Sequence, residues 1–473
     1  PDIRLARARE LGANPAHIGR LAADGWIEED EARIQRGPEL QGIDETLPPL
    51  VLTPEQRDAA GRIAAAPGDT FLVHGVTGSG KTEVYLDLIR RTLEAGRGAI
   101  VLVPEISLTP QALRRYGQRF GGTVTAIHSG LSTGELYDQW YRIKHGEARV
   151  VIGSRSAIFT PVNDLGLVVI DEEHEWTYKQ TDHHPRYHAR AAAAALCRLT
   201  GATLVLGSAT PDVTTYYRSE AGDIRRIELP VRVVPLEGGA TAPGFMPDVT
   251  VVDMREELRA GNRSMFSVPL QRAIQRALAG GEQAILFVNR RGSARFMLCR
   301  ECGYVPTCPT CEVAMSLDLG DPIRPRILCH HCGRAKRLDD RPFGVGTQRV
   351  EREAIASFPR ARVARWDSQT ASRKGAHERI VADLEAGRID ILVGTQMLAK
   401  GLDLPAMNVV GVVDADVGLS LPDYVAHERS FQLLSQVAGR AGRRGTVGRV
   451  FIQTYEPDAV PIRAAADHDY RAF

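Results

Sequence analysis

Short apolar runs alternate with amphipathic stretches over most of the chain. Six runs rich in Val, Ile and Leu predict the strands of a first lobe: Thr70–Val73, Ala99–Val103, Val124–Ile127, Val150–Ile152, Leu167–Ile170 and Thr203–Leu206. Near-continuous apolar strands with helical patterns between them are typical of a parallel sheet that is buried on both faces. This part of the chain is therefore predicted to be an α/β lobe.

The same pattern begins again after a Pro- and Gly-rich stretch at Leu229–Pro247. Six more apolar runs predict a second parallel sheet: Val249–Asp253, Ala284–Val288, Arg362–Ala364, Ile389–Val393, Val409–Val413 and Arg449–Ile452. A block of cysteines separates the strand that ends at Val288 from a predicted helix near Thr347–Phe358. The pattern predicts two α/β lobes, the second interrupted by an inserted metal module.

The N-terminal segment has a different pattern. Residues 1–40 predict short helices with a helix-to-helix turn at Gly12–Asn14, and the candidate core residues are Ile18, Leu21, Trp26 and Ile27. A remnant of a winged helix-turn-helix and a small helical cap fit this pattern equally well. A Pro-containing linker, Glu45–Pro49, follows. The chain begins at Pro1 rather than Met, so we expect it to be part of a longer protein.

Composition is typical of a globular protein but does not indicate a particular function. The 473 residues are 43% hydrophobic and 25% charged, as in globular proteins, and the length suggests about three domains. The net charge is only +1, so any nucleic-acid surface must come from local clusters of Lys and Arg. Apolar runs fall well short of the ~20 residues of a membrane span. A cytoplasmic protein without a membrane partner is expected.

The chemically most informative segment lies between the first predicted strand and a predicted helix, Thr82–Glu94. It reads Gly75, Val76, Thr77, Gly78, Ser79, Gly80, Lys81, Thr82. This is the G-x-x-x-x-G-K-[ST] phosphate-binding loop in its strand–loop–helix context. Its glycines aim backbone N–H donors inward, Lys81 brings a positive charge to the β- and γ-phosphates, and Thr82 offers a hydroxyl to Mg²⁺. The segment predicts a site for a nucleoside triphosphate such as ATP.

An acidic pair in the same predicted lobe complements this loop. Asp171 and Glu172 directly follow the apolar run Leu167–Ile170. Asp171 is placed to hold Mg²⁺ through water, and Glu172 to orient or deprotonate the attacking water. A helix start is the alternative for such acids, but a phosphate-binding loop in the same lobe favours catalysis.

The second lobe contributes the segment Gln436-Val-Ala-Gly-Arg-Ala-Gly-Arg443. Arg440 and Arg443 are three residues apart and would project from one face of a helix. Phosphoryl transfer needs positive charge at the γ-phosphate, and the planar guanidinium suits that task. We therefore assign Gln436, Arg440 and Arg443 to the catalytic set with Lys81, Asp171 and Glu172.

Six of the seven cysteines form a cluster. Two C-x2-C pairs with a spacing typical of zinc sites give one complete ligand set: Cys308, Cys311, Cys329 and Cys332. Four thiolates leave no open position, so this Zn²⁺ is predicted to be structural. Cys299 and Cys302 are left as half of a second site. His330 and His331 adjoin the first set and are not expected to reach the half-site. Cys197 is expected to be a core thiol.

Read together, these segments resemble superfamily 2 helicases, in which ATP binds between two RecA-like lobes. Leu52-Thr-Pro-Glu-Gln56 is similar to the element that recognises adenine through Gln56. Gly207-Ser-Ala-Thr210 is similar to the motif that couples hydrolysis to strand movement. Motifs IV and V of the superfamily have similar counterparts in Val288-Asn-Arg-Arg-Gly292 and Gly394-Thr-Gln-Met-Leu-Ala-Lys-Gly401.

Further segments narrow the resemblance to the PriA family of bacterial replication-restart helicases. They are Val103-Pro-Glu-Ile-Ser-Leu-Thr-Pro110, His128-Ser-Gly-Leu131, Gly153-Ser-Arg-Ser156, Asp171-Glu-Glu-His174, Tyr178-Lys-Gln180 and Arg186-Tyr-His-Ala-Arg190. The resemblance covers nearly all of residues 50–460, and residues 1–40 would be the tail of the family's winged-helix domain. The family's N-terminal 3′-end-binding domain and its C-terminal domain have no counterpart in this chain.

The resemblance implies a division of the chain and a function. It implies a winged-helix remnant with linker (1–47), an ATP-binding RecA-like lobe (48–230), a second lobe in two parts (231–298 and 342–473) and a zinc insertion (299–341). The implied activity is ATP-dependent 3′-to-5′ unwinding of branched DNA at stalled forks. The implied cofactors are Mg²⁺ and Zn²⁺. Single-stranded and forked DNA, primosome proteins and single-stranded-DNA-binding protein are the implied partners of an expected monomer.

Several residues are expected to bind DNA. Ser107, Thr109, Ser154, Thr395 and Gln396 offer groups that bond phosphates without reading sequence. Trp176, Tyr178 and Tyr187 resemble the family's aromatic-rich loop, and their polar neighbours predict that they are exposed. Members of the family carry a fourth C-x2-C pair that completes a second zinc site. Either this site has been lost or the last pair is absent from this chain, and we favour the second explanation.

Two other functions are open to such a chain. The first is a DNA-binding scaffold for primosome assembly that does not turn over ATP. The intact set of nucleotide residues favours an enzyme over this scaffold. The second is another superfamily 2 motor, such as an RNA helicase, and the cysteine block argues against it.

Overall fold

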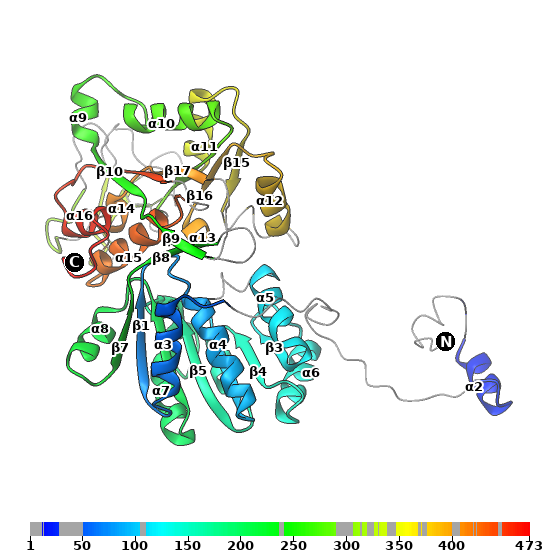
Figure 1. The fold of residues 1–473 in the computed structure, drawn as a ribbon. Coiled ribbons are helices and arrows are strands. Elements are labelled where there is room, and N and C mark those ends of the chain that lie inside the picture. Colours follow the sequence, from blue (N-terminus) through cyan, green and yellow to red (C-terminus); the bar gives the residue numbers. More distant parts are fainter. Residues whose placement is uncertain are drawn as a thin grey trace.

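The computed structural model consists mainly of two stacked α/β lobes (Figure 1). It describes residues 12, 14–27, 51–104, 110–235, 241–289, 306–312, 315–318, 326–329, 331–337, 347–367, 370, 376–399, 407–419, 421, 423–442 and 447–473. Both large sheets are parallel, as the alternation of apolar runs and helical patterns predicted. The predicted fold class, two RecA-like lobes with a cysteine cluster between parts of the second, is confirmed.

The first lobe is built on a seven-stranded sheet of order β3-β4-β2-β5-β6-β1-β7. Its strands are β1 (Thr70–Gly75), β2 (Gly98–Leu102), β3 (Val124–Ile127), β4 (Val150–Gly153), β5 (Leu165–Asp171), β6 (Thr203–Ser208) and β7 (Arg225–Leu229). Its helices are α3 (Pro54–Ala64), α4 (Lys81–Glu94), α5 (Pro110–Phe120), α6 (Thr133–Lys144), α7 (Ala189–Thr200) and α8 (Val213–Glu220). Short 3₁₀ helices are η2 (Gly121–Thr123), η3 (Arg155–Phe159) and η4 (Trp176–Tyr178).

Strand side chains alternate between two cores in this lobe. On β1, Phe71 and Val73 pack with α3, α4 and α5, whereas Leu72 packs on the opposite face with α7. Cys197 of α7 is buried in that second core, as expected of a core thiol. Because both faces are covered, the carboxyl edge of the sheet is where polar groups from several strands can meet.

The second lobe repeats the plan with a six-stranded sheet of order β10-β18-β17-β11-β16-β15. Its strands are β10 (Asp248–Asp253), β11 (Gln283–Phe287), β15 (Val363–Trp366), β16 (Ile391–Gly394), β17 (Met407–Val412) and β18 (Arg449–Thr454). Its helices are α9 (Met254–Arg259), α10 (Val268–Ala279), α11 (Thr347–Ser357), α12 (Ala376–Glu385), α13 (Gln396–Ala399), α14 (Asp416–Leu419), α15 (Ala426–Ala438) and α16 (Val460–Ala466). Helices α10 and α11 pack on one face and α15 and α16 on the other.

Some strands were not predicted. Edge strand β7 has the mixed burial of Arg225–Leu229, and its charged residues concealed it in the sequence. A hairpin of β8 (Arg232–Pro235) and β9 (Thr241–Gly244) lies within the stretch expected to be only a linker. The cysteine region forms a small antiparallel sheet of β12 (Ser316–Asp318), β13 (Arg326–Leu328) and β14 (Ala335–Arg337).

The N-terminal helix stands apart from both lobes (Figure 1). Helix α2 (Pro15–Ala23) buries Ile18, but Leu21, Trp26 and Ile27 are 44%, 78% and 39% exposed. The prediction that these three are core residues was wrong, because no other helix or strand in the described part of the chain packs against this nine-residue helix. None of the described helices combines the length and apolar surface that crossing a membrane requires.

Candidate functional site

The phosphate-binding loop connects β1 to α4 at the carboxyl edge of the first sheet. Gly78 and Gly80 adopt φ values of 81° and 79°, which side chains disfavour. A Cβ added to Gly75 would lie 2.5 Å from the Ser79 hydroxyl, so this position also requires glycine. Lys81 begins α4 and donates from Nζ to the carbonyl of Gly75 at 2.8 Å. The loop therefore has the glycine-dependent shape of a phosphate cradle.

Gln56 touches this loop from the preceding helix. Its Nε2 donates to the carbonyl of Ser79 at 3.0 Å, and its Oε1 accepts from the backbone N–H of Thr53 at 3.0 Å. The second bond belongs to the capping box that starts α3. The residue expected to recognise adenine thus lies beside the phosphate cradle, with its amide fixed at both ends.

The acidic pair lies where β5 ends. Asp171 accepts from the buried hydroxyl of Tyr85 at 3.2 Å, and its carbonyl accepts from the hydroxyl of Tyr178 at 2.7 Å. Burial, assisted by the charge of Glu172, raises the pKa of Asp171 to about 6. Glu172 itself has a φ of 48°, a strained value that turns its side chain out of the strand direction.

Tyr178 corrects a prediction. It was expected to be exposed with Trp176 and Tyr187, but only 1% of its surface is accessible. Its hydroxyl satisfies the Asp171 carbonyl, so the ring is buried beneath the acidic pair rather than presented to DNA. Trp176 is 47% exposed, as predicted.

A helix of the second lobe reaches these acids. Gln436 of α15 donates from Nε2 to Glu172 at 3.4 Å and lies 3.0 Å from Nε2 of His174. The other ring nitrogen of His174 is 2.7 Å from the hydroxyl of Ser208, which accepts from the backbone N–H of Thr210 at 2.9 Å. A continuous chain of polar contacts thus joins the second lobe, the acidic segment and the Gly207–Thr210 loop.

The end of α15 also approaches the phosphate cradle. A Cβ added to Gly439 would lie 2.6 Å from Cβ of Thr77, so only a glycine allows this approach. Arg440 is the next residue in the chain. However, α15 ends at Ala438, so the expectation that Arg440 and Arg443 share a helix face was wrong. Gly439 ends the helix, and Arg443 lies outside the described residues.

Four cysteines converge in the inserted region. The Sγ atoms of Cys308, Cys311, Cys329 and Cys332 all lie within 4.8 Å of one another. A tetrahedral zinc with Zn–S bonds of about 2.3 Å would require separations of about 3.8 Å. The 3.6 Å between Cys308 and Cys332 is close to that value, so the residues fit Zn²⁺. Cys299 and Cys302 lie outside the described residues.

Similarity to known proteins agrees with this geometry. Residues 53–218 match the DEAD/DEAH box helicase family, and residues 346–445 match the helicase conserved C-terminal domain. The replication restart protein PriA of Bacillus subtilis is 46% identical over 98% of this chain and 58% of its own length. PriA of Synechocystis is 45% identical over 89% of this chain and 52% of its own length.

The chain belongs to the PriA family of superfamily 2 helicases. It spans between half and three fifths of the length of these two PriA proteins. Among solved structures, Saccharomyces cerevisiae Dbp5, bound to RNA and ADP BeF3, has a TM-score of 0.51 with 14% identity. That likeness covers 98% of this chain and 94% of Dbp5 and concerns the fold alone.

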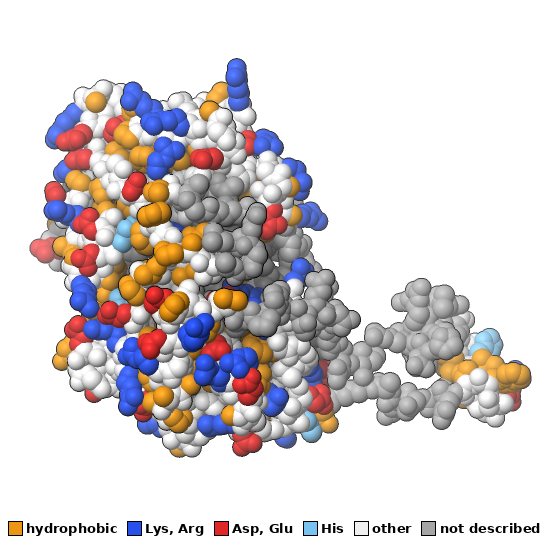
Figure 2. Space-filling model, viewed as in Figure 1, with side chains coloured by type: hydrophobic (Ala, Val, Ile, Leu, Met, Phe, Trp, Pro, Cys, Tyr) orange, Lys and Arg blue, Asp and Glu red, His pale blue; other side chains and the backbone are white. Residues whose placement is uncertain are grey.

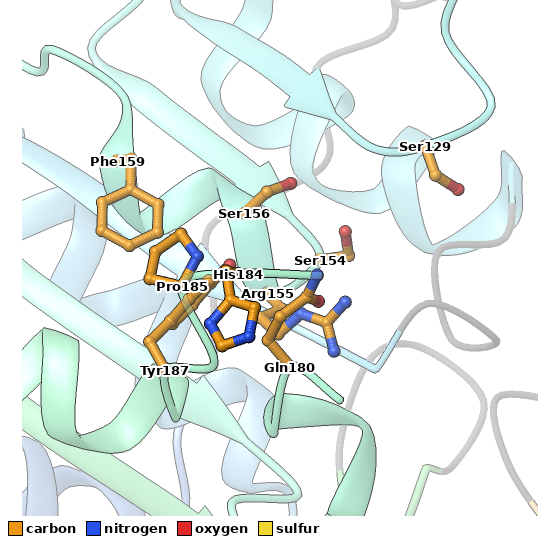
Figure 3. Close-up of a pocket in the computed structure, with 9 residues that line it drawn as sticks. All are labelled: Ser129, Ser154, Arg155, Ser156, Phe159, Gln180, His184, Pro185 and Tyr187. Carbon is orange, nitrogen blue, oxygen red and sulfur yellow. The ribbon is translucent and has the colours of Figure 1, made fainter. Parts of the chain in front are cut away.

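A second polar surface of this PriA-family chain lies on the first lobe (Figure 3). A pocket of about 550 Å³ is lined by Ser129, Ser154, Arg155, Ser156, Phe159, Gln180, His184, Pro185 and Tyr187. Arg155 donates to the carbonyls of Thr177 and Lys179 at 2.9 and 2.7 Å and so fixes the aromatic loop to η3. Among the described residues that line it, Arg155 is the one with a formal charge, and a positive charge suits a polyanionic ligand.

The other residues expected to contact DNA are only partly described. Ser107 and Thr109 lie outside the described residues. Thr395 and Gln396 follow β16 at the carboxyl edge of the second sheet. On the face shown in Figure 2, basic and acidic side chains are interspersed over both lobes, as the small net charge implies.

Sequence reasoning missed the residues that support the acids. Tyr85, His174 and Ser208 were not assigned roles, although each contacts a proposed catalytic group or connects two motifs. Tyr85 lies four residues after Lys81 on α4, and helical spacing was the available signal for its direction. The contact between His174 and Gln436 had no such signal.

Proposed function

We propose that the chain is the motor of an ATP-dependent 3′-to-5′ DNA helicase that acts on branched DNA at stalled forks and so restarts replication. The observation that carries this proposal is the contact of Gln436, from the second lobe, with Glu172 and His174 of the first. Through this contact, the arrangement of the hydrolytic residues depends on how the two lobes are placed relative to each other. Such dependence is what a motor requires to convert turnover into movement.

The nucleotide would lie between the lobes, with the Gly75–Thr82 loop around its phosphates. Lys81 would turn from the Gly75 carbonyl to the β- and γ-phosphates, and Arg440 and Arg443 would approach from the second lobe. Gln56 would read the adenine. Bound Mg²⁺ supplies charge neutralisation for the phosphates. Thr82 and Asp171 would hold it, and Glu172 would orient the attacking water.

Tyr85 supports the acidic pair in this scheme. Its hydroxyl donates to the Asp171 carboxylate and fixes the orientation of that side chain within the buried edge of the sheet. The raised pKa of Asp171 reflects burial of the carboxylate beside the charge of Glu172, which Lys81 offsets only in part. A divalent ion at this position would remove that penalty, so the site fits Mg²⁺ electrostatically.

Release of phosphate would be transmitted through His174. This ring contacts Gln436 on one side and Ser208 on the other, and Ser208 belongs to the loop that resembles the coupling motif. A change at Glu172 would therefore alter both the lobe contact and the loop. This arrangement supports the assignment of Gly207–Thr210 to coupling.

DNA would cross the carboxyl-edge loops of both lobes. Ser154 and the pocket of Figure 3 offer hydroxyls, an amide and exposed aromatic surface, the groups that bind a single strand without reading its sequence. The Zn²⁺ held by Cys308, Cys311, Cys329 and Cys332 would be structural, because no ligand position stays open. Cys299 and Cys302 would belong to a second site.

Family membership supports the cellular setting of the proposal. We propose a cytoplasmic monomer whose partners are forked and single-stranded DNA, primosome proteins and single-stranded-DNA-binding protein. The division of the chain at residues 47, 230, 298 and 341 is proposed on the same basis. Residues 1–47 would be what remains of a winged-helix domain.

Strand displacement tests the proposal. Partial duplexes with either a 3′ or a 5′ single-stranded tail, and a forked duplex, are incubated with the chain, ATP and Mg²⁺. We expect displacement from the 3′-tailed and forked substrates, and none with Lys81→Ala. Displacement only from the 5′-tailed duplex would contradict the polarity. Tight fork binding without any ATP turnover would instead support the scaffold.

A further inference from the structure

Three consecutive backbone groups at Pro211–Val213 are each held by a side chain from another part of the molecule. The Pro211 carbonyl accepts from the hydroxyl of Tyr470 at 2.9 Å. The Asp212 N–H donates to Glu173 at 2.8 Å, and the Val213 N–H donates to Glu428 at 3.0 Å. This turn directly follows the Gly207–Thr210 loop and starts α8.

Two of these three side chains come from the second lobe. Glu428 lies on α15, eight residues before Gln436, so both face the first lobe from one side of that helix. Tyr470 lies in the turn after α16, where the C-terminus meets the junction of the lobes (Figure 1). The third side chain, Glu173, belongs to the acidic segment itself.

The ring of Tyr470 also contacts residues of both lobes. It lies 5.1 Å from the ring of His74 and 4.7 Å from that of Tyr216, both in the first lobe. Phe431 of α15 lies 5.9 Å away on the side of the second lobe. His74 immediately precedes Gly75, so the ring of Tyr470 touches the strand that carries the phosphate cradle.

A neighbouring ion pair holds the same turn to the acidic segment. Arg190 donates to Glu173 at 2.6 Å and to Asp212 at 3.0 Å. Burial, assisted by the charge of Lys81, lowers the pKa of His74 to about 4, so this ring is neutral beside Lys81. The turn is thus bonded to the acidic segment, so a displacement that Tyr470 or Glu428 imposes on the turn would be passed to that segment.

We infer that Tyr470 and Glu428 are positioning residues that couple lobe movement to the Gly207–Thr210 loop. Both residues belong to the second lobe and hydrogen-bond to the backbone of Pro211–Val213. When DNA binding changes the placement of the second lobe, these two hydrogen bonds move the end of the Gly207–Thr210 loop. That loop contacts His174 through Ser208. The inference rests on the proposed ATP-driven motor and names how its lobes communicate.

The test separates coupling from folding and from catalysis. ATP turnover of the full chain is measured without DNA and with saturating single-stranded DNA for the wild type, Tyr470→Phe, Glu428→Ala and Glu428→Gln. Tyr470→Phe keeps the ring and removes only the hydroxyl. Glu428→Gln keeps an oxygen for the Val213 N–H, whereas Glu428→Ala removes it. Thermal melting confirms that each variant is folded.

We expect the ratio of DNA-stimulated to basal turnover to fall about fivefold to tenfold in Tyr470→Phe and Glu428→Ala, the size of effect of one lost hydrogen bond. Basal turnover and the KM for ATP should stay unchanged, and Glu428→Gln should restore the ratio. Tyr217→Phe is the matched control, because Tyr217 lies on α8 but is 68% exposed.

A wild-type ratio in both Tyr470→Phe and Glu428→Ala would overturn the inference. So would an equal loss of basal and stimulated turnover, because the residues would then support the chemistry and not its coupling. Absence of turnover in the wild type is a separate result, since it would contradict the proposed function itself.

Discussion

The nucleotide cleft and the cysteine cluster are assembled in opposite ways. The cleft joins Glu172 to Gln436 across 264 positions of the chain, and its side chains are held by hydrogen bonds from three different elements. The cluster gathers Cys308 to Cys332, and a metal would supply the bonds that hold it. The first site depends on the placement of two lobes, whereas the second depends on local chain geometry.

This difference predicts separable defects. Changes in the cleft should affect ATP turnover and everything driven by it. Changes in the cysteine cluster should lower strand displacement through the inserted region. ATP turnover should be affected only if the lobes unfold as well. A variant of one site that produced the defect expected of the other would contradict this difference.

The largest effect is expected from Lys81→Ala. Removing the charge from the phosphate cradle should lower DNA-stimulated ATP turnover by about a thousandfold or more. Fork binding, measured by a mobility shift, should be retained within about threefold because no DNA contact is proposed for Lys81. Full turnover in this variant would show that the cradle is not the catalytic nucleotide site.

The cluster is tested by Cys308→Ser or by chelation of zinc. Either change should lower strand displacement about tenfold or more while basal ATP turnover changes by less than about twofold to threefold, because the lobes have their own cores. Metal content is determined on the same preparation. Parallel loss of displacement and turnover would indicate that the cluster stabilises the whole fold.

Two metals per chain would also be informative. That result would show that Cys299 and Cys302 belong to a complete second site. One metal per chain would leave them without a full ligand set.

An intermediate effect is expected from Gln436→Ala. This change leaves the nucleotide residues of the first lobe intact but removes the contact with Glu172 and His174. DNA-stimulated turnover should fall roughly tenfold to a hundredfold, with little change in nucleotide affinity, since the interaction acts on catalysis. His427→Ala, on the same helix but exposed to solvent, is the matched control and should stay within about twofold. An equal loss in the control would indicate damage to the helix instead.

The smallest effect is expected from Tyr85→Phe. It removes the hydrogen bond to Asp171 and keeps the buried ring. The Mg²⁺ concentration for half-maximal turnover should rise about threefold to tenfold, since a typical hydrogen bond contributes about 1 kcal/mol. Unchanged Mg²⁺ dependence would show that Tyr85 does not orient the proposed ligand.

The sequence predicted the parts of both sites that depend on local spacing. The glycine pattern before Lys81 and the C-x2-C pairs each impose a backbone shape or a ligand geometry over a few residues, so they could be read directly. The twelve expected strands all exist, with ends that differ by up to a few residues. Edge strand β7 was not predicted because one side of it is exposed, and the charged residues on that side interrupt its apolar run.

Long-range contacts could not be predicted in this way. The burial of Tyr178 depends on the Asp171 carbonyl, and its polar neighbours in sequence pointed to the opposite conclusion. Arg440 was expected on a helix, but Gly439 ends α15 where it approaches Thr77 of the other lobe. Such contacts arise from packing between segments far apart in the chain, and periodicity within one segment carries no information on them.

The split nucleotide site is tested most directly by Arg440→Ala. ATP turnover is measured at saturating single-stranded DNA and Mg²⁺, and nucleotide affinity is measured separately by titration with a fluorescent ATP analogue. We predict that turnover falls at least about a hundredfold while affinity changes by less than about threefold, because an arginine from the second lobe acts mainly on the transition state. Turnover within about twofold of the wild type would contradict it.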